Sequence, residues 1–370
     1  MPYPQVELDA VKVYPLETRK SKSRIQDIAI DPDKEPPELP EDGAVIEEIA
    51  KRILRAREKG ASVMLAYGAH LVKNGAGPIL VKLMEHGWLT HLATQGAGGI
   101  HDWEFSYLGR SEEDVRANVA TGTFGTWEET GKYINLAVQV GAIKGMGYGE
   151  SLGALIENEG LEFPSPEELK RDIRNGVDGN GDFLPAKLEL LQTMQKFNLQ
   201  PGFLKVAHPN KKYSVFGNAY RLGIPMTVHP GIGYDIIYNN PYANGAALGR
   251  GSHIDFRIFV KSVMSLSHGV FMSIGSAIMA PQVFEKALSF ANNIKLQHGE
   301  KVQDHYLVVD DLQKSVWDWS KGEPPKSSPD YYLRFLKSFY RMGGQVRYVS
   351  IDNRVLLHNL YVKLKELTGR

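Results

Sequence analysis

The sequence contains no cysteine among its 370 residues. Disulfide bonds, thiolate nucleophiles and zinc sites built from cysteine are therefore excluded. A net charge is lacking too, because 43 Lys and Arg residues balance 43 Asp and Glu residues. This balance gives no electrostatic reason to expect a nucleic acid or an anionic membrane as a partner.

Long apolar runs are also lacking. The run at 269–274 has the length of a strand and is far shorter than a membrane span, and segment 1–24 has no apolar core of signal-peptide length. The hydrophobic share of 42% is typical of a globular protein, and the length allows one large α/β domain or two ordinary ones. We therefore expect a cytoplasmic globular protein with no membrane partner.

The first 43 residues differ from the rest of the chain. Segment 31–43 is rich in proline and in charged residues, a composition that does not favour a packed element. We expect residues 1–43 to form an extended N-terminal arm that lies over the domain or over a neighbouring subunit.

From residue 44 onward, short apolar runs alternate with helical patterns. Val45, Ile49 and Ile53 share one face of the first predicted helix, and Gly60 follows as a stop signal. A strand, a crossover helix and a second strand make the βαβ unit of a parallel sheet. The predicted strands are 62–67, 88–94, 224–228, 269–274, 304–309 and 346–350. The predicted helices are 44–58, 76–86, 210–221, 255–265, 281–292, 329–341 and 353–367.

This alternation predicts an α/β fold. We expect a Rossmann-like, doubly wound, mainly parallel sheet of six or more strands in a single domain over 44–370. Residues 103–200 read as mostly helical and are predicted to be an insertion into that domain.

Polar residues follow the predicted strands, where ligands bind in open parallel sheets. His70 follows the first strand, His101 and Asp102 follow the second, and His229 and Asp235 follow the third. A lone histidine is most often structural, but three at equivalent positions favour a functional site. We predict that these loops converge on one small-molecule site.

Glycines in the same loops allow two interpretations. Gly96, Gly98 and Gly99 lack a Cβ, so the backbone can approach a phosphate, and Gly231 and Gly233 could do the same. Neither loop matches G-x-G-x-x-G, the usual dinucleotide fingerprint. Tight strand-to-helix turns explain these glycines equally well.

Three segments resemble the deoxyhypusine synthase family. Segment 62–104 (SVMLAYGAHLVKNGAGPILVKLMEHGWLTHLATQGAGGIHDWE) looks like its first βαβ unit. Segment 213–241 resembles its helix, strand and Gly-x-x-x-Asp turn, here Gly231 to Asp235, and segment 269–288 resembles the strand and glycine turn that hold nicotinamide dinucleotide. The resemblance implies a Rossmann-like sheet, NAD bound between subunits, and a homotetramer.

The resemblance also assigns residues to roles. His101 and Asp102 occupy the positions of the family's acidic pair. The implied cofactor contacts are Ala69, His70, Thr94, Gly96, Gly98, Gly99, Gly231, Asp235, Gly275, Ser276 and Ala277.

The sequence departs from the family at the residues that carry its reaction. The lysine that captures the butylamine group as an imine aligns with Ala280, and an alanine cannot form an imine. The tryptophan, glutamate and histidine that hold the polyamine align with Phe335, Tyr331 and Asn240. The fold and part of the cofactor site are therefore expected to persist without the deoxyhypusine reaction.

The leading prediction is an NAD-dependent enzyme, a transferase or an oxidoreductase, that acts on a different small substrate, with an amine-containing one among the candidates. His101 or His229 would be its general base, and Asp102 or Asp235 would orient the imidazole or bind a cationic substrate. A second hypothesis is a metal-dependent hydrolase or lyase that uses His70, His101, Asp102 and His229. A third is a non-catalytic nucleotide-binding protein.

Overall fold

The computed structural model describes residues 3–39, 43–177, 179 and 181–369. The chain folds into two compact units, each assembled from separate stretches. Unit 1 takes in Met1–Asp27, Gly99–Arg221 and Pro230–Asp255. Unit 2 takes in Ile28–Gly98, Leu222–His229 and Phe256–Arg370.

Unit 2 is built on a six-stranded sheet in which every neighbouring pair is parallel. Its strands are β2 (Val63–Tyr67), β3 (His91–Thr94), β7 (Met226–Val228), β8 (Val270–Ile274), β9 (Tyr306–Asp310) and β10 (Gln345–Val349). Their spatial order is β10-β9-β8-β2-β3-β7. Numbered by their place along the chain, the strands stand in the order 3-2-1-4-5-6, which is the Rossmann order. The predicted fold class is confirmed.

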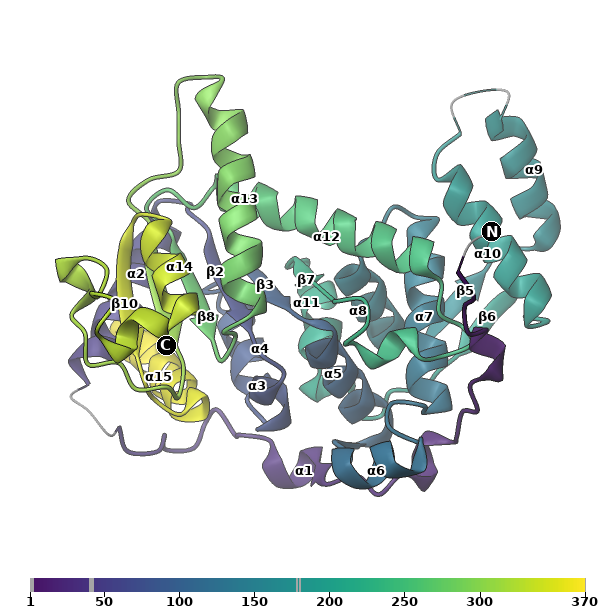
Figure 1. Ribbon diagram of the computed structural model, residues 1–370, viewed down its shortest axis with the longest axis horizontal. Coiled ribbons are helices and arrows are strands. Elements are labelled where there is room, and N and C mark those ends of the chain that lie inside the picture. Colours follow the sequence, from purple (N-terminus) through teal and green to yellow (C-terminus); the bar gives the residue numbers. More distant parts are fainter. Residues whose placement is uncertain (1–2, 40–42, 178, 180, 370) are drawn as a thin grey trace. The chain divides into compact units, whose positions relative to one another are not determined.

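The pairing of β2 with β8 joins distant parts of the sequence. Val63 lies opposite Val270 and Tyr67 lies opposite Ile274. Figure 1 shows this as a violet strand beside a green one. The winding of the sheet reverses at this pair, so the helices that follow β2 and β8 leave toward opposite faces.

Helices cover both faces of the sheet. On one face α2 (Ala44–Glu58) contacts β2, β8 and α15 (Asn353–Thr368), and α15 also contacts α4 (Gly77–Glu85). On the other face lie α13 (Met279–Leu296), α14 (Arg334–Arg341) and the last turns of α12 (Gly245–Met264). All five residues of β2, β8 and β9 are buried, as is expected for strands covered on two sides.

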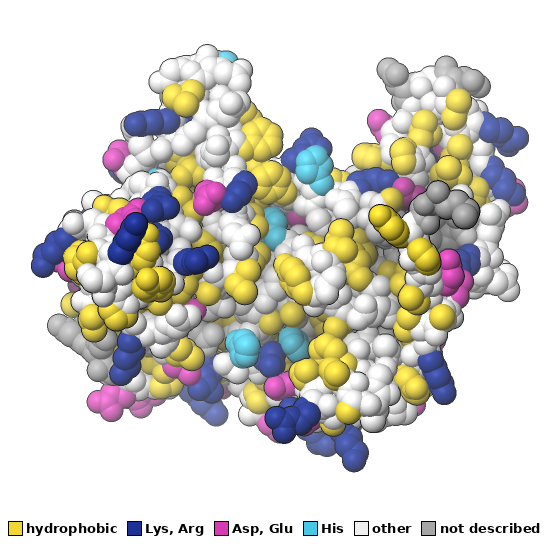
Figure 2. All heavy atoms as spheres, viewed as in Figure 1, with side chains coloured by type: hydrophobic (Ala, Val, Ile, Leu, Met, Phe, Trp, Pro, Cys, Tyr) yellow, Lys and Arg dark blue, Asp and Glu magenta, His cyan; other side chains and the backbone are white. Residues whose placement is uncertain are grey.

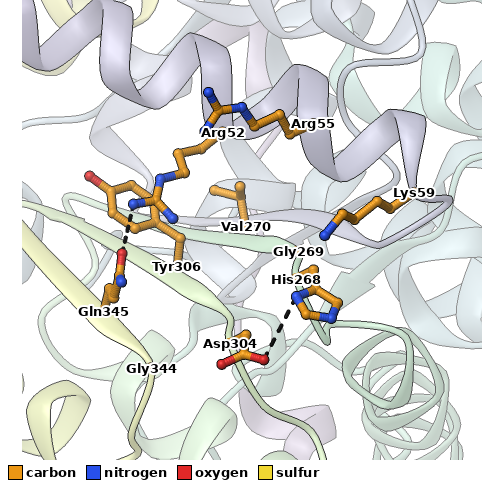
Figure 3. A pocket seen from close by; sticks show the side chains of 10 residues that line it. All are labelled: Arg52, Arg55, Lys59, His268, Gly269, Val270, Asp304, Tyr306, Gly344 and Gln345. Atoms are coloured by element: carbon orange, nitrogen blue, oxygen red, sulfur yellow. Dashed lines mark hydrogen bonds and ion pairs between the residues drawn. The ribbon is translucent and has the colours of Figure 1, made fainter.

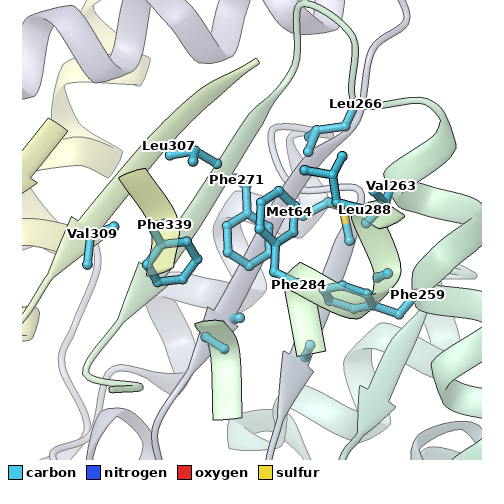
Figure 4. Close-up of a cluster of buried hydrophobic side chains, with 14 of the residues drawn as sticks. Met64, Phe259, Val263, Leu266, Phe271, Phe284, Leu288, Leu307, Val309 and Phe339 are labelled. Carbon is cyan, nitrogen blue, oxygen red and sulfur yellow. The ribbon is translucent and has the colours of Figure 1, made fainter. Parts of the chain in front are cut away.

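The second face holds the main hydrophobic core of unit 2, shown in Figure 4. Met64 and Phe271 reach it from the sheet, and Phe284 and Phe339 reach it from the helices. The rings of Phe271 and Phe284 stack with centroids 4.3 Å apart. This packing fixes α13 over β8 and so sets where α13 begins.

Unit 1 is mostly helical, as predicted for 103–200. Its helices are the greater part of α5 (Gly96–Leu108), then α6 (Val115–Thr121), α7 (Glu128–Ala142), α8 (Tyr148–Asn158), α9 (Pro166–Val177), α10 (Leu184–Lys196) and most of α11 (Val215–Leu222). Two antiparallel pairs add short strands: β1 (Ser23–Arg24) with β4 (Arg110–Ser111), and β5 (Gly160–Phe163) with β6 (Gly202–Lys205).

Part of the predicted arm is packed. Leu16, Arg19 and Ile25 are buried in unit 1, and Ser23 pairs with Ser111 across the β1–β4 ladder. Short 3-10 segments, η1 (Leu8–Ala10) and η2 (Leu16–Thr18), and the single turn α1 (Ile25–Ile28) make up the rest of its regular structure. Residues 14–27 are therefore a part of the fold of unit 1.

Several predicted boundaries are wrong. Residues 96–104, predicted as a loop, begin α5, because the low helix propensity of three nearby glycines hid a helix that packing stabilises. The helix predicted at 210–221 begins at Val215, and the one predicted at 255–265 begins ten residues earlier at Gly245. The pair β5–β6 lies in and just after the segment predicted as helical.

Among the described residues, no helix is both apolar enough and long enough to cross a membrane. On the face drawn in Figure 2, Lys and Arg side chains are interspersed with Asp and Glu side chains, and neither sign forms a continuous patch. This surface agrees with the equal numbers of basic and acidic residues in the sequence.

Replacing Phe284 by Ala should lower the free energy of unfolding of unit 2 by about 3–5 kcal/mol, because a fully buried ring is lost and a cavity remains. Urea denaturation followed by circular dichroism measures this change. Phe290→Ala on the same helix is the control, since Phe290 is 42% exposed and its loss should cost far less. Equal destabilisation by the two substitutions would contradict the assigned core.

Candidate functional site

The carboxyl ends of β2 and β8 lie at the point where the strand order of unit 2 reverses, and ligands of open α/β sheets bind in the crevice at this point. Gly68 follows β2 and Gly275 follows β8. A Cβ on Gly68 would lie 2.0 Å from the carbonyl oxygen of Gly275, so only glycine fits there. The Gly68 N–H donates to Ile274 O at 3.1 Å, which ties the two strand ends together.

Gly275 differs from Gly68 in what surrounds it. Its φ is +58°, in the left-handed region that glycine tolerates best. A Cβ there would meet only Asn353 Nδ2, at 3.6 Å, so the backbone of Gly275 faces open space. A ligand can therefore approach this backbone closely.

Helix α13 begins four residues after Gly275, and its first turn faces the same edge of the sheet. The first N–H groups of a helix lack intrahelical partners and attract anions. The hydroxyl of Ser276 accepts a hydrogen bond from the Ala280 N–H at 3.2 Å and so satisfies one of them. Ser276 and Ala277 thus connect the strand to an anion-attracting helix end.

At the end of β3, Thr94 is buried and serves the fold. Its hydroxyl donates to Tyr67 O at 2.9 Å, and a Cβ on Gly98 would lie 2.2 Å from this hydroxyl oxygen. The glycine therefore lets α5 start directly at the strand end. With its amide nitrogen toward Thr94, Gln95 accepts from the Ala69 N–H at 3.2 Å and joins the turns after β2 and β3. For Gly98 the tight-turn interpretation has a direct packing reason.

Asp310, the last residue of β9, was not among the predicted site residues. Burial raises the pKa of its carboxyl group to about 7, although the Ile351 N–H, which donates to Oδ1 at 3.2 Å, acts in the opposite direction. Its carbonyl oxygen accepts from the Gly275 N–H at 2.9 Å, so Asp310 adjoins the glycine turn. The sequence feature that could have revealed Asp310 is the position of an acidic residue directly after the predicted strand 304–309.

The two histidines of unit 2 in the predicted site have different surroundings. His70 is exposed and is the first residue of α3 (His70–Lys73), directly after the turn that follows β2. His229 is buried, and its Nε2 lies 3.1 Å from Thr227 Oγ1. Burial lowers the pKa of His229 to about 3. The imidazole is therefore neutral at pH 7 and a weak proton acceptor.

His229 belongs to a buried polar chain. Thr227 Oγ1 also lies 3.0 Å from His91 Nε2, and His91 Nδ1 lies 2.8 Å from Ser262 Oγ. Burial, followed by the nearby His229, lowers the pKa of His91 to about 3. The ring of Phe259 packs edge-on against both imidazoles, with centroids 5.3 Å away. The sequence pattern gave no sign of this chain, because its members lie 2 to 171 residues apart.

In unit 1, Asp102 holds the start of α11. Its Oδ1 accepts from the Val215 N–H at 2.7 Å, and its Oδ2 accepts from the Ser214 hydroxyl and from the Phe216 N–H at 3.4 Å. Burial raises the pKa of Asp102 to about 6, against the effect of these hydrogen bonds. Both carboxylate oxygens are thus engaged in capping a helix.

His101 is half-buried and joins a network centred on Glu104. His101 Nδ1 lies 2.7 Å from Ser111 Oγ, which donates to Glu104 at 2.5 Å. Arg19 donates to both oxygens of Glu104, at 2.8 and 2.6 Å. Burial favours the neutral acid, but the charge and hydrogen bonds of Arg19 outweigh burial and lower the pKa of Glu104. The arm therefore neutralises a buried carboxylate beside His101.

Asp235 and Gly231 form a closed turn in unit 1. Asp235 Oδ2 accepts from the Gly231 N–H at 2.7 Å, and burial raises the pKa of Asp235 to about 6. Gly99, in α5, packs beside Leu152 and Phe216. Contacts within unit 1 therefore explain why Asp235, Gly231 and Gly99 stand at these positions.

The predicted site residues are thus divided between the units. Unit 2 holds Ala69, His70, Thr94, Gly96, Gly98, His229, Gly275, Ser276 and Ala277. Unit 1 holds Gly99, His101, Asp102, Gly231 and Asp235. Within the described part of the chain, no three His, Asp or Glu side chains are grouped as metal ligands.

The known proteins to which this chain is similar share little of its sequence. No family model and no curated protein matches the sequence. A solved structure of a candidate LOR/SDH protein from Methanococcus maripaludis S2 is 16% identical, with a TM-score of 0.45, over 92% of this chain and 74% of that chain. AgrE in complex with ornithine and NAD⁺ is 14% identical, with a TM-score of 0.44, over 90% of this chain and 35% of AgrE.

A third solved structure belongs to the family that the sequence resembles. It is a candidate deoxyhypusine synthase from Entamoeba histolytica, 10% identical with a TM-score of 0.34, over 73% of this chain and 79% of that one. This chain spans about a third of the length of AgrE. At these identities and TM-scores, neither the ligands nor the activities of these proteins transfer to this chain.

The buried histidines should make unit 2 less stable in acid. Because the pKa values of His91 and His229 are lowered from 6.5 to about 3, the unfolded state binds more protons between these values, and stability falls as the pH drops below 6.5. Each histidine contributes a slope of up to about 1.4 kcal/mol per pH unit. The double substitution His91→Gln/His229→Gln should flatten the slope measured by urea unfolding between about pH 6.5 and pH 4.

The comparison with the wild type is essential to that measurement. The raised pKa values of Asp310, Asp102 and Asp235 produce the opposite slope in part of the same window, and they are present in both proteins. His298→Gln, at an exposed site, should leave the slope unchanged. Identical slopes for the double variant and the wild type would overturn the assignment.

Asp102→Ala should lower the free energy of unfolding by roughly 2–3 kcal/mol at pH 7, because the buried donors at the start of α11 lose their acceptor. Asp102→Asn keeps an acceptor for the Val215 N–H and should cost markedly less. Chemical denaturation of both variants measures the difference. Equal losses would show that capping is not the role of this carboxylate.

Proposed function

We propose that unit 2 binds NAD at the crevice between β2 and β8, and that the protein is an NAD-dependent enzyme acting on a small molecule. The observation that carries this proposal is the Rossmann strand order, with a glycine turn after each strand at the point of reversal. The resemblance of 269–288 to a nicotinamide dinucleotide turn supports the same position.

The residues at this crevice fit a dinucleotide. Only Asn353 Nδ2 comes within 4 Å of a Cβ placed on Gly275, so its backbone is open to a ligand. In the first turn of α13 the Ala280 N–H is bonded to Ser276 and Pro281 has no N–H, which leaves the Met279 N–H to face a pyrophosphate. Asp310 adjoins the glycine turn, but its carboxyl group is buried and Oδ1 accepts from the Ile351 N–H, so it is assigned no contact with the ribose. The exposed His70 and the Gly68–Ala69 turn would line the other side.

When bound, NAD supplies a hydride acceptor, and the protein must then remove a proton from the substrate. Of the two predicted bases, His229 is a weak acceptor because of its lowered pKa. Asp102, which was predicted to orient a base or to bind a cationic substrate, has both carboxylate oxygens engaged at the start of α11. His101, the other predicted base, belongs to unit 1 and is assigned no step at this crevice. Ala280 lies buried in the first turn of α13, so imine formation at this position, and with it deoxyhypusine synthesis, is not part of the proposal.

NAD titration of the folded protein, followed by calorimetry, tests the proposal. Gly275→Ala should weaken NAD binding by about tenfold or more, because a methyl group would hold the pyrophosphate away from the backbone. Gly299→Ala is a matched control, since Gly299 also has a positive φ, +71°, and open space at its Cβ position. Both variants carry similar backbone strain, but only Gly275 lies at the crevice.

Two results would overturn this proposal. The first is an absence of binding at millimolar NAD to protein that is shown to be folded. The second is an equal loss of affinity in Gly275→Ala and Gly299→Ala, since this would trace the effect to backbone strain and not to the crevice.

A further inference from the structure

A pocket lies at the edge of the same sheet that is opposite to the glycine turns. It has a volume of about 450 Å³ and is lined by the first residues of β8, β9 and β10, Val270, Tyr306 and Gln345. The glycine turns of the proposed NAD site follow the last residues of β2 and β8, which run parallel to β9 and β10. The two sites therefore occupy opposite edges of unit 2.

One wall of the pocket is cationic. Arg52, Arg55 and Lys59 have the spacing i, i+3 and i+7, which places them on one face at the end of α2. Figure 3 shows Arg52 reaching over the Tyr306 ring toward Gln345, and Lys59 pointing toward His268. The three charges thus line the pocket along its length.

Arg52 is held in place by the pocket itself. It donates to Gln345 Oε1 at 2.7 Å, and its guanidinium lies 4.8 Å from the centroid of the Tyr306 ring. Glu48 is 3.8 Å away, one turn earlier on the helix. An arginine fixed by a ring and an amide keeps donors for a ligand without needing to reorganise.

Arg55 and Lys59 contrast with Arg57 on the same helix. Arg57 donates to the carbonyl oxygens of Gly87 and Ala61, both at 2.9 Å, and so fastens the end of α2. Within the described residues, the side chains of Arg55 and Lys59 have no hydrogen-bond or ion-pair partner. Cations near a helix C-terminus are favoured by the helix dipole, but this effect does not require them to line a pocket.

The opposite wall adds one carboxylate and a constrained backbone. Asp304 Oδ2 lies 3.8 Å from His268 Nδ1, and both residues have positive φ, +56° and +61°. Non-glycine residues in this region carry strain that commonly persists at functional sites. Three cations face Asp304, and Glu48 lies 3.8 Å from Arg52, so the pocket keeps an excess of positive charge.

We propose that this pocket binds a small phosphate-bearing ligand, distinct from the dinucleotide at the other edge of the sheet. The planar forks of Arg52 and Arg55 match phosphate oxygens, and Lys59 adds a point charge. The volume exceeds the needs of a single phosphate and accommodates a ligand of mononucleotide size. Such a ligand could bind while NAD is bound, so the pocket would be a second-substrate or effector site.

Pyrophosphate is the probe for the test. It is titrated by calorimetry into the full-length protein, with saturating NAD present, at low and at physiological ionic strength. We expect saturable binding that weakens with salt, because the contacts are charged and exposed to solvent. Arg55→Gln/Lys59→Gln should weaken binding by about tenfold or more, with an unchanged melting temperature, since both side chains are exposed.

The control variant removes the same charge elsewhere in unit 2. Lys261→Gln/Lys286→Gln replaces two exposed lysines on α12 and α13 and should leave pyrophosphate affinity within about twofold of the wild type. Equal losses of pyrophosphate affinity in the two double variants would show that the effect comes from net charge alone, and this would overturn the proposal. So would the absence of saturable binding, or displacement of pyrophosphate by NAD, since the latter would place both ligands in one site.

Discussion

The ends of β2 and β8 are in backbone contact, and this contact limits what the carboxyl edge of unit 2 can be. A side chain at Gly68 would displace the Gly275 carbonyl, and the Gly275 N–H is in turn bonded to the end of β9. Three strand ends are thereby held in one cluster of backbone hydrogen bonds. This cluster fixes the point at which α13 begins. It also leaves the backbone of Gly275 exposed to the space beyond the strand ends. What this edge offers to a ligand is mainly backbone, which recognises phosphate by geometry and not by side-chain charge.

The two edges of the sheet have opposite chemistry. The carboxyl edge combines helix N-termini with a buried acid, Asp310, whereas the amino edge presents Arg52, Arg55 and Lys59 from the end of α2. Parallel strands make this asymmetry natural, because every crossover helix that begins at one edge ends near the other. At the end of α2, Arg57 is bonded to the carbonyl oxygens of Gly87 and Ala61 and so stabilises the fold. Arg55 and Lys59 make no such bond among the described residues and line the pocket instead.

The sheet could be predicted because each strand is an apolar run with a crossover helix beside it, and all six were found to within a few residues. The start of α5 could not, since Gly96, Gly98 and Gly99 disfavour a helix unless Thr94 and Phe216 are already placed against them. The predicted site was harder for the same reason. Polar residues at strand ends also cap helices and close turns, and only the tertiary partners of Asp102 or Asp235 reveal which task occupies them. Asp310 and His91 were missed because their partners lie far away in sequence.

Each unit is assembled from separate stretches of the chain, and the stretches of the two units alternate along the sequence. The last stretch of unit 1 ends at Asp255, so this unit can be completed while later residues are still on the ribosome. Unit 2 begins earlier but needs β8, β9 and β10, the final strands of the sheet. Until they emerge, β2 and β3 expose apolar faces and an unpaired edge. Slow synthesis would therefore lengthen the period in which the edge of β2 that pairs with β8 stays open.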